Sequence, residues 1–224
     1  MAYLPYNETI DSMVKKILIK IRVAMNGVTS ELMADKGVQY SRNFGVAFPN
    51  LRTIAKGYEQ NELLATHLWL KSIRETKILA ILLFPANALT EKKAVEWVKE
   101  CDTIELVEYL CAYLLVEMPF SSKLIEKLAH AEDEKMLIAA YALAAQYCKK
   151  FKPLILDDFL PLLRFSSFHL SPKLAQSMLF FLLYAVNQQG YKVLVLAEME
   201  RLHEEQTDTI ATWLYTEFNS LIED

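Results

Sequence analysis

Cationic side chains flank one segment of unusual composition, residues 40–49. Two phenylalanines, a valine and a tyrosine surround Gly45 there, whereas solvent-exposed loops usually hold fewer apolar residues. We therefore expect the loop to pack against neighbouring helices, with Gly45 in a backbone conformation that other residues disfavour. Arg42, Arg52 and Lys56 would then flank a fixed loop and a helix N-terminus, an arrangement that can contact phosphate. The same spacing fits equally well a loop that only fills space between helices, with its charged side chains in solvent. Both interpretations stay open.

The sequence contains none of the common motifs for metal binding, nucleophilic catalysis or phosphate binding. The four histidines are scattered, the three cysteines include no CxxC pair, and no GxSxG motif or glycine-rich phosphate loop occurs. We expect Cys101, Cys111 and Cys148 to remain outside any metal site or disulfide framework. Neither a metal nor a cofactor is predicted.

The elements that must position these residues are expected to be helices. Leucine (35) and alanine (22) make up about a quarter of the 224 residues, and both are strong helix formers. The spacing of Met13, Ile17, Ile21 and Ala24 predicts an amphipathic helix over 10–24 with a basic face. Asn26-Gly27 would end it, and a short helix over 29–36 follows. Further helices are expected at 49–59, 61–71, 73–84, 91–100, 103–117, 121–131, 133–150, 154–164, 171–188, 191–205 and 208–221.

Helices of this length, joined by short links, favour one all-α domain of stacked HEAT-like hairpins over residues 1–224. Its N-terminal helices and loop would occupy 1–48, and the helical repeats 49–224. Asp102 and Ser121 are among the residues predicted to cap helices. Trp69, Trp97, Trp213 and the run 178–186 are predicted to lie in the core.

Charge is unevenly distributed along the chain. Residues 1–100 contain 14 Lys/Arg and 10 Asp/Glu, whereas residues 101–224 contain 10 and 18, for a total of −4. A strongly basic nucleic-acid-binding domain is therefore excluded, and any polyanion contact should use a local face of the first half. The longest apolar runs have nine residues, about half of what a membrane span needs, and no signal peptide is visible. We expect a cytoplasmic protein that does not bind membranes.

Two motifs carry a family resemblance. Gly45 to Arg52 reads Gly-Val-x-x-Pro-x-x-Arg, and Trp69 to Glu75 reads Trp-x-x-x-x-Arg-Glu. Over residues 37–84 the chain resembles the DNA alkylation repair enzyme family of HEAT-like repeat DNA glycosylases. The resemblance implies a right-handed superhelix whose concave basic face holds double-stranded, alkylated DNA, with Arg42, Arg52, Lys56 and Arg74 as DNA-facing cations.

The resemblance also implies a chemistry. Family enzymes release positively charged N-alkylated purines, chiefly 3-methyladenine and 7-methylguanine, and a carboxylate near the sugar stabilises the oxocarbenium-like transition state. Active members carry a Trp-x-x-x-Asp pattern, which corresponds here to Ile104 and Glu108. An expected Arg has only Lys135 nearby, and a second expected Trp corresponds at best to Phe180.

Two functions follow from these correspondences. The protein is either a divergent alkylpurine glycosylase with Glu108 as its catalytic carboxylate, or a non-catalytic relative that binds DNA structures or a protein partner. Glu108 as a solvated helix residue, with no catalytic role, is an equally good interpretation of that position.

Overall fold

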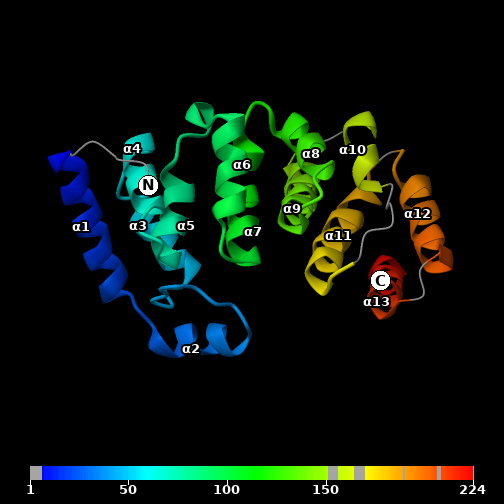
Figure 1. The fold of residues 1–224 in the computed structure, drawn as a ribbon, viewed down its shortest axis with the longest axis horizontal. Helices are drawn as coiled ribbons and strands as arrows, with labels where there is room; N and C mark the ends of the chain where they lie inside the picture. Colours follow the sequence, from blue (N-terminus) through cyan, green and yellow to red (C-terminus); the bar gives the residue numbers. More distant parts are fainter. Residues whose placement is uncertain (1–6, 151–155, 164–169, 189, 206–207, 224) are drawn as a thin grey trace. The chain divides into compact units, whose positions relative to one another are not determined.

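The computed structural model describes residues 7–150, 156–163, 170–188, 190–205 and 208–223, and these ranges contain helices but no strand (Figure 1). None of the helices in those ranges combines the length and the hydropathy that crossing a bilayer requires. The α-helices are α1 (Glu8–Val23), α2 (Gly27–Asp35), α3 (Phe48–Ala55), α4 (Glu62–Trp69), α5 (Arg74–Leu83), α6 (Glu91–Glu100), α7 (Ile104–Tyr113), α8 (Ser121–Ala129), α9 (Glu134–Lys150), α10 (Leu156–Leu163), α11 (Pro172–Ala185), α12 (Lys192–Glu205) and α13 (Thr209–Glu223). Two short 3-10 helices, η1 (Ala86–Ala88) and η2 (Leu115–Glu117), lie between them.

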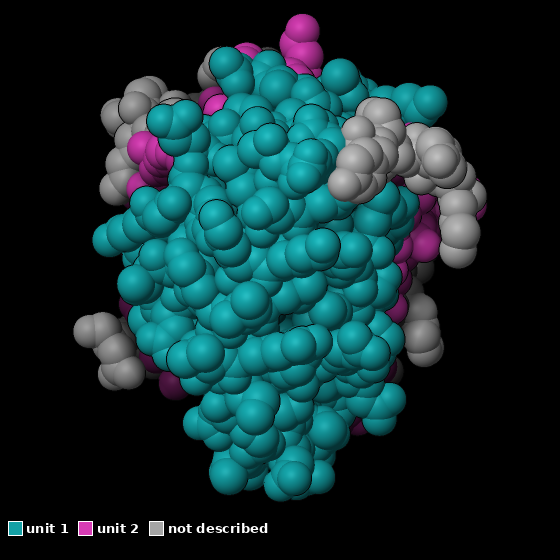
Figure 2. Space-filling view, turned by 90° about the vertical axis from the view of Figure 1, so that its left-hand side faces the viewer, with its two compact units in different colours: residues 1–94, 100–114 teal, residues 95–99, 115–224 magenta. Residues whose placement is uncertain are grey.

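The chain forms two compact units (Figure 2). Unit 1 comprises residues 1–94 and 100–114, and unit 2 comprises residues 95–99 and 115–224. Each unit has its own hydrophobic core. The single repeat domain expected from the sequence stays a prediction.

Helix α5 is the centre of unit 1. It packs against α3, α4 and α7, and every residue except Leu82 is buried. Its first turn carries the polar residues Arg74, Glu75, Thr76 and Lys77 into the interior. Buried charges require partners, so this turn must organise the polar contacts around it.

Helix α9 is the corresponding centre of unit 2, where it packs against α8 and α11. Helix α11 in turn packs against α13. The predicted burial of the run 178–186 is only partly confirmed, because the Phe180 side chain is 49% exposed while Phe181 is fully buried. Trp69 and Trp97 lie in the core as predicted, but Trp213 is 41% exposed on α13.

Three helix ends differ from the sequence-based predictions. Asn26 does not end α1; its side chain accepts the Thr29 backbone N–H and starts α2. The cap of α7 is Thr103, whose hydroxyl accepts the Leu106 N–H, because Asp102 instead pairs with a lysine of α5. Ser121 is already inside α8, and its hydroxyl donates back to the preceding turn. At α7 the Thr103 hydroxyl is thus the capping oxygen, whereas Phe120, the N-cap residue of α8, forms no side-chain cap hydrogen bond.

Candidate nucleic-acid interface

The loop over residues 38–47 is fixed to α5 by one carboxylate. Glu75 is fully buried, and its Oε1 accepts hydrogen bonds from the backbone N–H groups of Phe44, at 3.1 Å, and Val46, at 3.2 Å. Hydrogen bonds to a charged acceptor are stronger than those between neutral groups. This contact confirms the prediction that the loop is ordered and packed.

Gly45 has the predicted special conformation. Its φ is +67°, a region that side chains disfavour. A Cβ at this position would lie 2.0 Å from the carbonyl oxygen of Asn26 and 2.8 Å from the backbone nitrogen of Ser30. Only glycine therefore lets the loop pass this close to the start of α2.

Arg74 holds the other side of the loop. Its guanidinium forms two hydrogen bonds with the Glu105 carboxylate, Nε to Oε2 at 2.9 Å and Nη2 to Oε1 at 2.6 Å. Nη1 donates to the Val46 carbonyl at 3.1 Å, and the side chain is only 5% exposed. Burial by itself would lower the pKa of Arg74. The hydrogen bonds from Arg74 to Glu105 and the negative charges of Glu105 and Glu75 outweigh this effect and raise the pKa, so the guanidinium stays charged.

Arg74 thus differs from its expected role as a DNA-facing cation. Its charge is already used by partners inside unit 1, and the side chain is not available to a phosphate. Arg74 is a positioning residue for the loop, and only Arg42, Arg52 and Lys56 remain as candidate DNA contacts.

Glu105 is likewise occupied by protein partners. Besides Arg74, it accepts a short hydrogen bond from the Tyr40 hydroxyl, which in turn accepts one from Thr103 at 2.6 Å. Burial and the neighbouring Glu105 raise the pKa of Tyr40 well above its usual range, so the phenol remains a donor. Of the two acids of α7 closest to the loop, Glu108 is therefore the one open to a ligand.

Glu108 lies on α7 with a solvent-accessible side chain. Partial burial among its neighbours raises the pKa of its carboxyl group, and the negative charge of Glu105 raises it further. A carboxylate in such a place is destabilised in its charged form, so a cation brought beside it gains a larger electrostatic stabilisation. This property suits the role implied by the resemblance, although the role itself stays a proposal.

An aromatic cluster, defined as Phe48, Tyr109 and Tyr113, joins the start of α3 to α7. The Phe48 ring centroid lies 4.6 Å from that of Tyr109 in a stacked arrangement and 4.9 Å from that of Tyr113. Tyr113 is 39% exposed, so part of the cluster faces solvent. Sequence reasoning missed the two tyrosines, although their spacing of four residues places them on one face of α7.

Helix α3 links this cluster to two exposed cations. Phe48 and Arg52 lie one turn apart along one side of α3, and Lys56, four residues after Arg52, is the C-cap residue that follows this helix. Arg52 and Lys56 also line a depression of about 220 Å³ together with Tyr58, whose ring has Lys20 Nζ 4.7 Å from its centre. The side of α3 that carries the aromatic contact thus continues into a cationic surface.

Arg42 belongs to the loop itself. Its side chain is exposed, while its backbone carbonyl accepts the Arg74 N–H at 3.0 Å. The main chain of Arg42 is thereby fixed, and its guanidinium extends from an ordered segment. The three remaining cations all belong to unit 1.

The family model described as "DNA alkylation repair enzyme" matches residues 25–170, which is more than half of the chain. The chain belongs to the DNA alkylation repair enzyme family. This match includes the loop, α3, α5 and α7, and therefore every element of the candidate interface.

Comparison with solved structures supports the HEAT-like fold. One structure covers 92% of this chain and 94% of its own, with a TM-score of 0.75 and 17% identity. It represents a family described as related to the HEAT-like repeat DNA glycosylases, with affinity for branched DNA structures. A search of the curated proteins gave no match.

The residues that the resemblance compares with catalytic residues of active family members lie on three helices. Ile104 is the half-buried first residue of α7, one turn before Glu108. In unit 2, Lys135 lies at the start of α9 and Phe180 is exposed on α11. Ile104 lacks the expected ring, whereas the cluster around Phe48 places rings on the same helix as Glu108.

Proposed function

We propose that this protein binds DNA and that it prefers branched or locally unpaired structures to continuous duplex. Membership of the DNA alkylation repair family and the fold shared with a protein of stated branched-DNA affinity support this proposal. The observation that carries it is the partly exposed aromatic cluster on α3 and α7, with Arg52 on α3 and Lys56 at the C-terminal end of that helix.

Aromatic side chains bind nucleic acids by stacking on unpaired bases. Each base stacked on a protein ring contributes about 1–3 kcal/mol, and it must first be free of its neighbours in the duplex. A branch point interrupts the continuous base stack and so can expose the face of a base to a protein ring, whereas continuous duplex does not. The exposed part of Tyr113 is the surface on which a base would stack, with Phe48 and Tyr109 holding that ring in place.

The cations of unit 1 would hold the backbone on either side of that base. Arg52 lies one turn beyond Phe48 on α3, Lys56 is the C-cap residue of that helix, and Arg42 extends from the fixed loop. Contacts between such side chains and phosphates release counterions, so the affinity must fall as the salt concentration rises. The acids of α7 would disfavour phosphates close to the aromatic cluster and thereby favour a base there.

Binding to a four-way junction, a three-way junction and a duplex of equal length tests this proposal. We expect the junctions to bind at least about tenfold more tightly than the duplex at the same salt concentration. Tyr113→Ala should weaken junction binding about 5- to 150-fold, the equivalent of one lost stacking contact. The control Tyr113→Phe keeps the ring and should retain the affinity. Equal affinity for junction and duplex would contradict binding by base stacking on Tyr113. Equal junction affinities of Tyr113→Ala and Tyr113→Phe would contradict it as well.

A second candidate function is removal of alkylated purines, with Glu108 as the catalytic carboxylate. The specific observation in its favour is the accessible Glu108 carboxyl with its raised pKa, next in sequence to the ring of Tyr109. An alkylated purine is a cationic leaving group: the glycosidic bond breaks, its electron pair goes to the purine, and the positive charge moves to the sugar. The Glu108 carboxylate would stabilise that charge until water adds to C1′ and releases a proton.

Release of 3-methyladenine or 7-methylguanine from alkylated duplex DNA tests this second function. If the enzyme is active, Glu108→Gln should lower the rate by about two to three orders of magnitude, as loss of one electrostatic contact to a transition state usually does. DNA binding should persist in that variant. If the parent protein binds junctions but releases no alkylated base, the glycosylase function is rejected and DNA binding is the function that stands.

A further inference from the structure

Exposed aliphatic side chains gather on α1 and α2 of unit 1. Of the eleven large apolar side chains that are exposed among the described residues, five belong to this short part of the chain. Their exposed fractions are 54–83%, and they are Ile19, Val23, Met25, Val28 and Leu32. Single exposed apolar residues are common, whereas a cluster of them marks a site of interaction. We call this cluster the α1–α2 surface.

Helix α2 buries little of its own surface. It contains no buried residue, and in Figure 1 it lies apart from α3, α4 and α5. Polar contacts with the loop hold it: the Asn26 N–H donates to the Phe44 carbonyl at 2.8 Å, and the Ser30 hydroxyl donates to the Asn43 carbonyl at 3.1 Å. A helix of nine residues is too short to be stable in water by itself. A partner that covers its apolar side chains would therefore stabilise it.

The exposed side of α2 is apolar and anionic. Val28, Glu31, Leu32 and Asp35 follow the spacing that places residues on one side of a helix, and all four are exposed. Asp35 also lies in the last turn, where the helix dipole disfavours a negative charge. A cationic partner would offset that effect.

The exposed side of α1 combines apolar residues with the opposite charge. Ile19 and Val23 lie one turn apart, and the exposed residues Lys16 and Arg22 are each three positions from Ile19. Residues 15–23 contain four Lys or Arg and no Asp or Glu. The outer side of α1 is thus the electrostatic complement of the outer side of α2.

The charges of the two helices are not paired with each other inside one chain. Within the part of the chain that the structure describes, no ion pair or side-chain hydrogen bond involves Lys16, Arg22, Glu31 or Asp35. Val23 and Val28 are both more than half exposed, so the two outer sides do not cover each other either. Both are open to another molecule.

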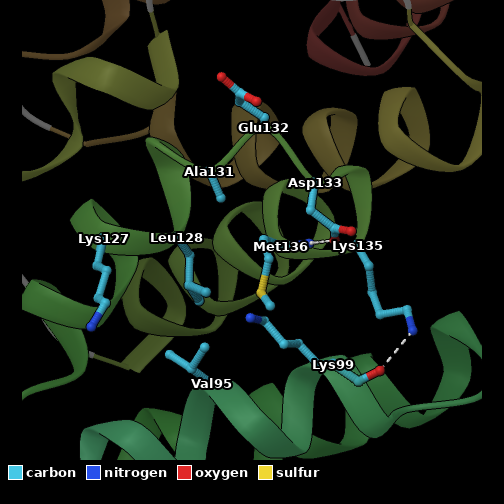
Figure 3. A pocket seen from close by; sticks show the side chains of 9 residues that line it. All are labelled: Val95, Lys99, Lys127, Leu128, Ala131, Glu132, Asp133, Lys135 and Met136. Atoms are coloured by element: carbon cyan, nitrogen blue, oxygen red, sulfur yellow. Dashed lines mark hydrogen bonds between the residues drawn. The ribbon is translucent and has the colours of Figure 1, made fainter.

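A lysine-lined pocket of about 350 Å³ in unit 2 lacks this property (Figure 3). Lys135 Nζ donates to the Lys99 backbone carbonyl at 2.9 Å, and Glu132 and Asp133 belong to the same lining. Figure 3 shows the ammonium groups of Lys127 and Lys135 at opposite edges of the pocket. Groups of the same chain therefore offset its charges.

A second copy of the chain offers both complementary sides at once. In a two-fold dimer, α2 of one copy can pack on α1 of the other, and the symmetry repeats the contact. The pairs Ile19–Val23 and Val28–Leu32 have the same spacing of four residues, so their side chains can interdigitate. Contact of α1 with α1, or of α2 with α2, would instead bring like charges together.

We propose that this protein forms a two-fold dimer in which the outer side of α2 in each copy packs on the outer side of α1 in the other. The proposal is independent of DNA binding. The dimer would carry two copies of the candidate nucleic-acid interface.

Sedimentation velocity at increasing protein concentration tests the dimer. We expect the parent protein to pass from monomer to dimer, and Val23→Lys to weaken the association at least about tenfold, because the lost apolar contact occurs twice. Val193→Lys is the matched control, since Val193 on α12 is 78% exposed and Val23 is 83% exposed. It should dimerise like the parent. A parent protein that stays monomeric, or a Val23→Lys protein that dimerises as the parent does, would overturn the proposal.

Exchange of charges tests which helices meet. The variants K16E/R22E and E31K/D35K should each weaken the association at least about tenfold, because each puts like charges on both helices. The quadruple variant K16E/R22E/E31K/D35K restores opposite charges and should recover the dimer. If circular dichroism shows this variant folded and it stays monomeric, the α1–α2 contact is overturned. A monomeric parent that binds vesicles of anionic phospholipid would also overturn it and assign the surface to a membrane.

Discussion

The guanidinium of Arg74 and the carboxylate of Glu105 lie side by side and join α5 to α7 through two hydrogen bonds, of 2.9 and 2.6 Å. The two residues are 31 positions apart in the sequence. The same guanidinium holds the Val46 carbonyl, so one ion pair fixes both the helix that carries Glu108 and the loop that leads to Phe48. The aromatic cluster depends on this pair because its rings come from those two segments.

Removal of Glu105 should destabilise unit 1. Glu105→Ala leaves a buried guanidinium with only Glu75, 3.4 Å away, as a charged partner, and we expect a loss of about 2–4 kcal/mol in the free energy of unfolding. Denaturant titration measures it. Glu205→Ala is the matched control: it removes an exposed carboxylate paired with Arg201 on α12 and should cost less than about 1 kcal/mol. Equal losses in the two variants would show that the buried pair does not support the fold.

Replacement of Gly45 should be more damaging than its size suggests. Gly45→Ala forces a side chain into a conformation with φ of +67° and against the backbone of Asn26, so we expect a loss of at least about 3 kcal/mol. Gly27→Ala is the control, because a Cβ there meets no atom within 4 Å and φ is not positive. Thermal unfolding compares the two. A Gly45→Ala protein as stable as Gly27→Ala would contradict the close approach of the loop to α2.

The raised pKa of Glu108 predicts a pH-dependent effect on stability. A carboxyl group whose pKa is higher in the folded than in the unfolded state stabilises the folded protein fully when the pH is below the unfolded-state pKa, near 4. That stabilisation is lost as the pH rises through the folded-state pKa. The charged form is therefore the disfavoured one at neutral pH. We expect Glu108→Gln to raise the melting temperature at pH 7 and to have a smaller effect near pH 4.

Melting curves of the parent and of Glu108→Gln at several pH values measure this effect. Glu59→Gln, an exposed acid of the same unit, controls for the loss of one negative charge. A Glu108→Gln protein that melts below the parent at pH 7 would show that the carboxylate is stabilised in the folded state, opposite to our expectation.

Lys77 should be required for the turn between α6 and α7. Its buried ammonium donates to the Glu100 carbonyl at 2.8 Å and to Asp102 at 2.7 Å, and it lies 5.2 Å from the ring centre of Trp69. Lys77→Met keeps the apolar stem but leaves the carbonyl without this donor, so we expect a loss of about 1–3 kcal/mol.

Lys71→Met removes an exposed lysine of the same unit and serves as the control in denaturant titrations. It should change stability by no more than about 0.5 kcal/mol. A Lys77→Met protein that matches this control would show that solvent or another donor satisfies the turn.

The helices, the ordered loop and the special conformation of Gly45 could be predicted from the amino-acid sequence. Helix positions follow from the spacing of apolar residues, which is a local property, and the predicted bounds agree with the structure within a few residues for most helices. Likewise, a glycine among apolar loop residues indicates an unusual backbone without reference to distant segments.

Which charged and aromatic side chains remain available to a ligand depends on how the helices pack in space. Arg74 matches a family motif as well as Arg52 does, yet the first is buried against Glu105 and the second is exposed. Nothing near Arg74 in the sequence reveals this, because its partner lies on another helix 31 residues away. The stacking of Tyr109 on Phe48 depends in the same way on how α7 packs beside the start of α3. The free energy of a charge or a ring depends on what surrounds it in space, and those surroundings exist only after the helices have packed.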